Sequence, residues 1–253
     1  MKFGAALLFL LLSAHLSSPE RPKSFRDLQW QYPRVRTAAA QKDKVLSDRF
    51  QREGLPYPPH AILLRAFKKE ASLELWASPA EDRPYVLVNE YSICTSSGVL
   101  GPKRRFGDEQ VPEGFYELNW FNPQSNFYLS MHISYPNASD RILGSRQNLG
   151  GDIFLHGDCA SIGCIPITDE GIKEVYWLAV LVHSQSQQHL PIQIFPARLT
   201  DEAVKSLAAS YSGQPQLVAF WRNLKEGYDA FEGTRRLARI STRSDGSYVF
   251  SRH

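Results

Sequence analysis

The pattern of apolar and polar residues predicts a body rich in strands with helices at both ends. Residues 37–52 place apolar side chains among charges at helical spacing, and a cluster of Gly and Pro follows, so we expect an amphipathic helix there. Helical spacing returns at Thr168, whose hydroxyl is suited to cap a helix, and again from Asp201. Short runs with the alternation typical of strands occur at residues 62–67, 73–77, 85–94, 115–120, 128–133, 152–156 and 192–195.

Mostly short strands with a few helices predict a mainly β fold of the α+β class. We expect a β-rich domain at residues 60–198, preceded at residues 19–59 by an N-terminal arm and helix. A helical C-terminal extension is expected at residues 199–253. Residues 19–35 are expected to form a linker or extended arm, and the polar C-terminal tail to be loosely ordered.

The N-terminus has the pattern of a secretory signal peptide at residues 1–18. Lys2 supplies an early positive charge, residues 5–12 are apolar, and small polar residues precede Pro19. The apolar run is too short to span a bilayer comfortably, and no cysteine lies near its end to carry a lipid anchor. The sequence therefore predicts an exported protein without an integral membrane segment after signal removal. An uncleaved anchor or a buried helix is the alternative.

Composition sets limits on the class of partner. The chain has 253 residues, 43% of them hydrophobic and 22% charged, which is ordinary for a protein with its own core. The formal net charge of +3 is too small and too evenly spread to indicate nucleic acid. It is compatible with an anionic polymer such as cell wall.

The chain contains three cysteines, Cys94, Cys159 and Cys164. In an exported protein an odd number leaves at least one thiol unpaired or paired between chains. Because a free thiol is a liability in an oxidising compartment, its presence suggests use. Cys94 and Cys159 are a candidate disulfide that leaves Cys164 free. The alternative is two separate buried thiols.

Residues 156–164 carry the densest candidate chemistry. A cysteine attacks as the thiolate, and a histidine within reach can take its proton, so His156 and Cys164 form a candidate base and nucleophile. Gly163 allows backbone N–H groups to approach an oxyanion, and Ser161 is placed to hold the loop or orient the histidine. The helix that begins at Thr168 would lower the thiol pKa if its N-terminus points toward the sulfur.

Two other interpretations of these residues remain open. A lone cysteine and histidine are often structural, since free cysteine behaves as a small buried apolar residue. His156, Cys159 and Cys164, with His132, are also a conceivable metal-ligand set. Their spacings are not those of common zinc modules, so we expect no metal.

The segment from His156 to Cys164 resembles the HG…S-x-G-C signature of YkuD-type L,D-transpeptidase domains. Its compact form, H-G-x-C-x-S-x-G-C, is similar to the YafK-like branch of that family. The resemblance extends over roughly residues 60–232. Further blocks that resemble the branch lie at residues 97–103, 107–116, 135–141, 195–198 and 220–232.

The resemblance implies a β-sandwich enzyme that acts on the peptide stems of peptidoglycan and needs no cofactor. In the family reaction the thiolate attacks the carbonyl of the third residue of a tetrapeptide stem, a diamino acid, and expels the terminal D-alanine. An amine then resolves the thioester. By motif position Cys164 is the nucleophile, His156 the base, Gly163 and Cys164 the sources of oxyanion N–H groups, and Ser161 a supporting residue. A periplasmic location and a role in cell wall biogenesis and cell shape are implied as well.

The chain departs from the family pattern beside the cysteine. Many members have a histidine before the Gly-Cys pair, where this chain has Ile162, and a polar residue after it, where this chain has residues 165–167. The acceptor and the balance between transfer and hydrolysis therefore stay open. One alternative is a cysteine amidase that hydrolyses the link between a lipoprotein and peptidoglycan. The other is a non-catalytic wall-binding module with structural cysteines.

Several further residues are candidates for contacts with substrate. Arg141 is suited to bind a carboxylate through its guanidinium, and otherwise braces a loop. His132 and Gly157 are expected to line the pocket. Lys103 and Asp108 lie in a long loop at residues 97–114, where they hold substrate or pin the loop.

Overall fold

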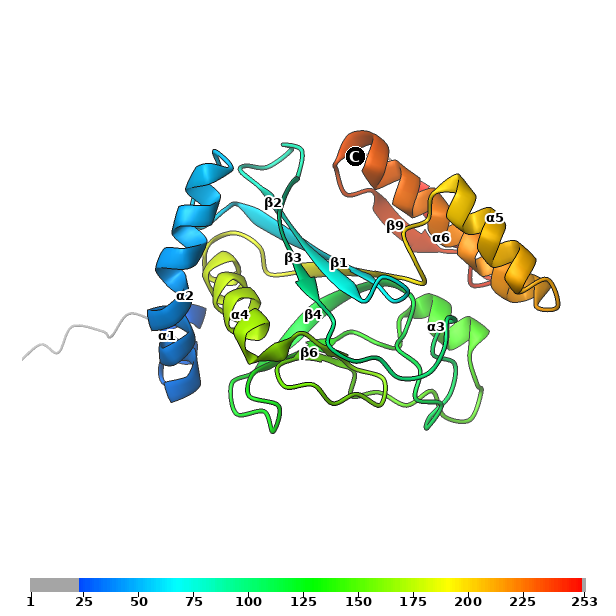
Figure 1. Cartoon of the computed structure of the whole chain (residues 1–253), viewed down its shortest axis with the longest axis horizontal. Helices are drawn as coiled ribbons and strands as arrows, with labels where there is room; N and C mark the ends of the chain where they lie inside the picture. Colours follow the sequence, from blue (N-terminus) through cyan, green and yellow to red (C-terminus); the bar gives the residue numbers. More distant parts are fainter. Residues whose placement is uncertain (1–22, 252–253) are drawn as a thin grey trace, which may run out of the picture.

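The computed structural model describes residues 23–251, so the predicted signal peptide lies outside the described residues. A mixed eight-stranded sheet forms the centre, with strand order β3-β2-β1-β8-β4-β5-β6-β7 and helices on both faces (Figure 1). The helices are α1 (Phe25–Trp30), α2 (Pro33–Arg52), α3 (Ala138–Leu143), α4 (Thr168–Gln185), α5 (Asp201–Ser210) and α6 (Pro215–Thr234). The sheet strands are β1 (Ala61–Phe67), β2 (Ser72–Ser78), β3 (Val86–Ser92), β4 (Gly114–Asn122), β5 (Ser130–Ile133), β6 (Phe154–His156), β7 (Ile165–Pro166) and β8 (Leu190–Phe195).

The first half of the sheet is covered on both faces. Successive residues of a strand point to opposite sides, so each strand contributes side chains to the clusters on both faces. In β1, Ile62 and Leu64 belong to the main core shared with α4, whereas Leu63 and Phe67 belong to smaller clusters shared with α6. Both β1 and β2 are buried along their whole length for this reason. The antiparallel hairpin predicted for these two runs is confirmed.

The two helical regions lie on opposite faces of the sheet (Figure 1). Helices α1 and α2 pack on α4 along one face. On the other face α6 covers β1, β2 and β8, through ring contacts such as Tyr228 with Phe67 and Phe231 with Trp76. At the other end of the sheet, strands β5–β7 pack on the apolar core with their first face. Their second face carries the polar side chains of Ser130, His132 and His156. The candidate site opens on this uncovered part.

The predicted sheet-dominated α+β class is confirmed, and helix α2 and the C-terminal helices occur where a helix was expected. Hydrogen bonds join the eight strands into one continuous sheet rather than two separate sheets. The predicted helix begins at Thr168, whose Oγ1 accepts from the Gly171 N–H at 3.3 Å, but the cap position falls on Ile167, which forms no side-chain cap hydrogen bond. Within residues 23–251 no helix has both the length and the apolar character needed to cross a bilayer.

Two local predictions are wrong. The expected linker at residues 19–35 contains α1 and the start of α2, because Ser24 caps α1 and Pro33 opens α2. Helix α3 has the same kind of cap at Asn137. The C-terminal tail is ordered as a hairpin of β9 (Arg239–Thr242) and β10 (Tyr248–Ser251), because Tyr248 is buried against aromatic rings.

A buried ion pair fixes the loop of residues 97–114, which we call the support loop, to the sheet and to α6. Glu113 is fully buried and accepts hydrogen bonds from the Gly101 N–H at 2.7 Å and the Trp221 Nε1–H at 2.7 Å. Its carboxylate lies 2.9 Å from Lys68 Nζ, which also donates to the carbonyls of Gly101 and Val111. One carboxylate therefore satisfies three donors from separate segments.

We expect Glu113→Gln to lower the free energy of unfolding by about 3 kcal/mol or more, since it leaves the buried Lys68 charge without a counter-ion. Equilibrium unfolding in urea measures the change. The matched control is Asp48→Asn, which removes an exposed partner of Lys44 at 2.8 Å and should change stability by less than about 0.5 kcal/mol. Equal effects of the two variants would contradict the assigned role of Glu113.

Candidate active site

The pairing of two short strands places the predicted nucleophile and base on one face of the sheet. Strands β6 and β7 are parallel, with Leu155 opposite Ile165 and His156 opposite Pro166. Leu155 and Ile165 both lie in the main core. Because side chains alternate, His156 and Cys164 point away from that core, toward the uncovered face. They are diagonal neighbours across the strand pair.

Both residues line one cavity of about 460 Å³. His156 contributes from the end of β6 and Cys164 from the residue before β7, and the loop between them, residues 157–164, forms one wall. We call this segment the catalytic loop. Strands β4 and β5 and the connection between them supply the opposite wall. The remaining lining residues are Asn122, Ser125, Asn126, Phe127, Ser130, Asp152, Phe154, Ala160, Ser161 and Ile162.

The imidazole of His156 is held in one tautomer with its second nitrogen free. Its Nδ1 lies 2.5 Å from the carbonyl oxygen of Gly157, which can only accept, so Nδ1 carries the proton. Nε2 is buried and has no hydrogen-bond partner among residues 23–251. Burial lowers the pKa of His156 below its ordinary value, so the ring is neutral at pH 7. Phe127 stacks on the ring at 4.6 Å and limits its rotation.

The thiol of Cys164 is half-buried and protonated at rest. Burial raises its pKa above the ordinary value, because the thiolate loses solvation. The Phe154 N–H, which donates to Sγ at 3.4 Å, and the charge of Lys103 act in the opposite direction but do not reverse the shift. The expected lowering of the thiol pKa by the N-terminus of α4 stays a prediction, since the causes of this shift are burial, Phe154, Asp152 and Lys103.

Gly163 and Ser161 shape the catalytic loop rather than the oxyanion site. Gly163 has φ +128°, and a Cβ there would lie 3.1 Å from the Gln110 carbonyl oxygen, so no other residue fits without strain. The Gly163 N–H donates to Ser161 Oγ at 3.2 Å, and Ser161 Oγ donates to the Cys164 carbonyl at 2.8 Å. The predicted oxyanion role of Gly163 is thus not supported, because its N–H is already engaged. Of the two roles predicted for Ser161, the structure supports holding the loop.

A disulfide joins Cys94, which follows β3, to Cys159 in the catalytic loop, and Cys164 is a free thiol. The predicted pairing is confirmed. The Cys94 N–H also donates to the Pro166 carbonyl at 3.1 Å, so both ends of the catalytic loop are tied to the end of β3. The metal-ligand alternative is excluded for this set, because Cys159 is consumed by the disulfide and His132 does not line the cavity.

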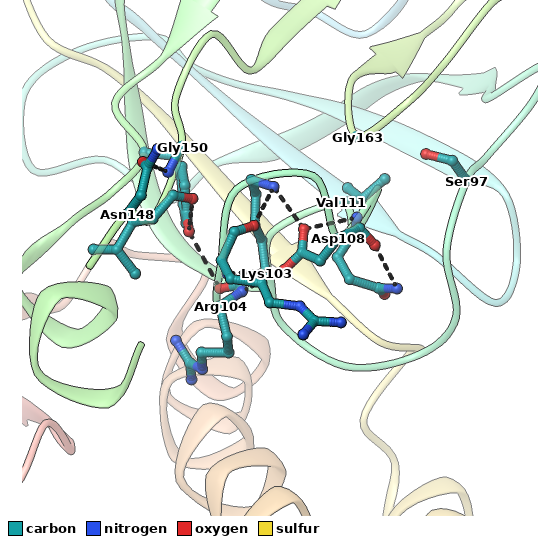
Figure 2. Close-up of polar contacts among 12 residues, drawn as sticks. Ser97, Lys103, Arg104, Asp108, Val111, Asn148, Gly150 and Gly163 are labelled. Carbon is teal, nitrogen blue, oxygen red and sulfur yellow. Dashed lines mark hydrogen bonds and ion pairs between the residues drawn. The ribbon is translucent and has the colours of Figure 1, made fainter. Parts of the chain in front are cut away.

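The support loop lies next to the catalytic loop, with Val111 and Ser97 drawn near Gly163 in Figure 2. Lys103 Nζ lies 2.6 Å from Asp108 Oδ1, and Asp108 also accepts the Arg104 N–H at 2.8 Å, so this pair pins the loop. Ser97 Oγ contacts Ser161 Oγ at 3.3 Å. Lys103 is buried and does not line the cavity, which favours the loop-pinning role over a role in holding substrate.

The residues predicted to bind substrate fall into different places. Gly157 is buried behind His156, where its carbonyl holds the tautomer and an added Cβ would meet Asp169 Oδ1 at 2.5 Å. His132 does not line the cavity. Its ring packs against that of Phe154, which does, with the two ring centroids 5.2 Å apart. Arg141 is exposed on α3 and is not among the lining residues. The structure therefore does not bring these three together with Cys164.

Sequence reasoning missed the opposite wall of the cavity. Ser130 lies directly across from His156 in the β5–β6 ladder, a position that the predicted strand pair would have indicated. Phe127 and Asn126 come from the irregular segment after β4, for which the sequence carries no comparable signal. Asp152 was included in a predicted strand but lies before it, with φ +57°.

Comparison with known proteins matches this arrangement to one enzyme family. Residues 75–182 match the YkuD family model, described as the L,D-transpeptidase catalytic domain. The protein named "Putative L,D-transpeptidase YafK" of Escherichia coli K12 is 38% identical over 193 residues, which cover 76% of this chain and 74% of that protein. The protein of the same name in Escherichia coli O157:H7 matches with the same values.

Solved structures with lower similarity include the helical cell shape determining protein Pgp2 of Campylobacter jejuni. Its TM-score is 0.44 at 17% identity, over 73% of each chain. L,D-transpeptidase 1 of Mycobacterium tuberculosis has a TM-score of 0.30 at 13% identity, over 53% of this chain and 61% of that chain.

We expect Gly163→Ala to lower the rate of Cys164 alkylation by iodoacetamide markedly while the fold persists, because the Cβ shifts the catalytic loop against the Gln110 carbonyl. The displaced sulfur would lose the nearby imidazole as the group that takes its proton, and the thiolate is the species that is alkylated. The matched control is Gly213→Ala, where a Cβ meets nothing within 4 Å. If both variants react like the native protein, the conformational role of Gly163 is wrong.

Proposed function

The chain belongs to the L,D-transpeptidase catalytic-domain family, and on that premise we propose that it is an exported cysteine acyltransferase acting on the peptide stems of peptidoglycan. The supporting observation is that a candidate nucleophile and a candidate base line the same cavity. A free thiol, Cys164, and a partnerless, unprotonated imidazole nitrogen, His156 Nε2, line the same 460 Å³ space. A base without a partner next to a nucleophile is the arrangement that activates a thiol.

The proposed acylation begins with transfer of the Cys164 proton to His156 Nε2. The sulfur then attacks the carbonyl carbon of the third stem residue, a diamino acid, and a tetrahedral oxyanion forms. Collapse of this intermediate breaks the bond to the terminal D-alanine, whose nitrogen takes the proton from the His156 imidazolium. The product is a thioester on Cys164 and free D-alanine.

The second half-reaction resolves the thioester. An acceptor amine gives up a proton to His156 Nε2 as it attacks the thioester carbonyl, and the sulfur leaves and recovers the proton. The result is a new amide and the free enzyme. Water in place of the amine yields a carboxylic acid, so the same site supports hydrolysis, including release of a lipoprotein from the wall. Since the Gly163 N–H is engaged by Ser161, we propose the Cys164 backbone N–H as an oxyanion donor.

Export to the periplasm is part of the proposal. It rests on the leader-like pattern of residues 1–18 and on the Cys94–Cys159 disulfide, since structural disulfides persist in oxidising compartments. A cell wall substrate lies in that compartment. Cys94 and Cys159 form the disulfide, and Cys164 stays free. This distribution suits an exported protein that uses one thiol for catalysis.

We expect purified protein incubated with a tetrapeptide stem to gain the mass of the stem minus D-alanine on Cys164, as detected by intact-protein mass spectrometry. Cys164→Ala should show no adduct and no turnover, whereas Cys164→Ser should keep the fold with little or no turnover. With an amine acceptor the product mass reports transfer, and without one it reports hydrolysis. An inert Cys164 with every muropeptide would leave only the non-catalytic wall-binding alternative.

We expect kcat/KM to fall on the acid side only below about pH 6.5, the ordinary pKa of histidine. Burial lowers the pKa of His156, so Nε2 stays unprotonated to a lower pH than in solution. A pH profile with a saturating acceptor measures this limb. A limb well above pH 6.5 would mean that the resting site is a thiolate–imidazolium pair, contrary to the structure.

A further inference from the structure

One carboxylate lines the active-site cavity, and it stands without a counter-ion. Asp152 is the only acidic residue among the lining residues, and neither lysine nor arginine lines the cavity. Within residues 23–251 no side chain forms an ion pair or hydrogen bond with the Asp152 carboxylate. Its backbone carbonyl accepts from the Cys164 thiol at 3.7 Å, so the residue lies beside the nucleophile.

The backbone at Asp152 has a conformation that aspartate tolerates better than most residues other than glycine. Its φ of +57° lies in the left-handed region, which glycine adopts with the least strain. Asp82 and Asp158 adopt the same conformation, with φ +56° each, so the backbone alone assigns no function to Asp152. The case for a use of the carboxylate rests on its place in the cavity beside the thiol.

The carboxylate also opposes the proposed chemistry in the free protein. Two charged groups act on Cys164 from the surrounding segments, Asp152 and Lys103. Burial is the main cause of the raised pKa of the thiol, and the negative charge of Asp152 raises it further, while Lys103 lowers it. Lys103 is itself paired with Asp108, so its charge is partly neutralised. A cation bound at Asp152 would offset this negative charge and favour the thiolate.

We propose that Asp152 binds the side-chain ammonium of the diamino acid that carries the reacting carbonyl. The inference rests on the proposed function, in which that residue must enter the cavity beside Cys164. The remaining lining side chains are neutral at pH 7, so Asp152 is the group in the cavity that recognises a cation by charge. A charge-assisted hydrogen bond of this kind also orients the carbonyl toward the sulfur.

The acceptor amine is the less suitable occupant of this position. An amine must lose its proton before it attacks the thioester, and a carboxylate next to it would stabilise the protonated, unreactive form. The ammonium on the donor side chain keeps its proton throughout the reaction. Binding it beside Asp152 neutralises the charge that hinders the thiolate, so the donor promotes ionisation of the thiol that attacks it.

The test compares two donors and two variants in single-turnover formation of the thioester, followed by intact-protein mass spectrometry. The donors are a tetrapeptide stem with a free side-chain amine and the same stem with that amine acetylated. The variants are Asp152→Asn and, as a matched control, Glu109→Gln. Glu109 is also an exposed carboxylate in left-handed conformation, φ +55°, but it does not line the cavity.

With the free-amine donor, Asp152→Asn should acylate at least about tenfold more slowly than the native protein, as expected for loss of a charge-assisted hydrogen bond. With the acetylated donor, the native protein should be slowed by a similar factor and Asp152→Asn should be no slower than native. Alkylation of the free protein by iodoacetamide should show a lower Cys164 pKa in Asp152→Asn. Glu109→Gln should match the native protein in every assay.

Two results would overturn the assignment. One is equal acylation of the native protein by both donors, which would mean that the amine is not recognised. The other is an equal loss with both donors in Asp152→Asn, which would give Asp152 a structural role only. If neither donor acylates the native protein, the proposed function itself fails, and the alkylation profile then shows separately whether Asp152 acts on the thiol.

Discussion

The parallel pairing of β6 with β7 is the constraint on which the site depends. With Leu155 opposite Ile165 in the core, His156 and Cys164 face the same side of the sheet. A shift of one residue would turn Cys164 into the main core and expose Ile165. The Cys94–Cys159 disulfide and the hydrogen bond from the Ile167 N–H to the His156 carbonyl, 3.0 Å long, help to hold the two strands at that register. Two residue pairs, Leu155 with Ile165 and His156 with Pro166, thus fix the two ends of the catalytic loop.

Burial determines the resting state of the pair. The cavity raises the pKa of the Cys164 thiol and lowers that of His156, so both groups are neutral before substrate binds. A neutral thiol is less exposed to oxidation than a thiolate, which suits a protein that keeps one free cysteine in an oxidising compartment. Activation then depends on the bound substrate, and the Gly157 carbonyl ensures that Nε2 is the nitrogen available to take the proton.

The sequence predicted the parts of the site that are local in the chain and missed those built by packing. His156, Cys164 and the disulfide follow from a short motif and an odd number of cysteines, and the strands follow from alternation. Ser130 follows only once the two predicted strands β5 and β6 are paired, and Phe127 comes from an irregular segment for which the sequence carries no comparable signal. The hydrogen bond from the Gly163 N–H to Ser161, which does not favour the predicted oxyanion role, forms only once the loop is folded and has no signal in the sequence. The ordered C-terminal hairpin depends on Tyr248 packing against Phe115, from a distant segment.

The most direct test of this account is the protonation state of His156 in the free protein, measured by nitrogen-15 NMR of histidine-labelled protein at neutral pH. Loss of the signal in His156→Gln assigns the resonances. The structure predicts a neutral ring with the proton on Nδ1 and an unprotonated Nε2. A doubly protonated ring, or a proton on Nε2, would contradict the proposal that this nitrogen is the base for Cys164.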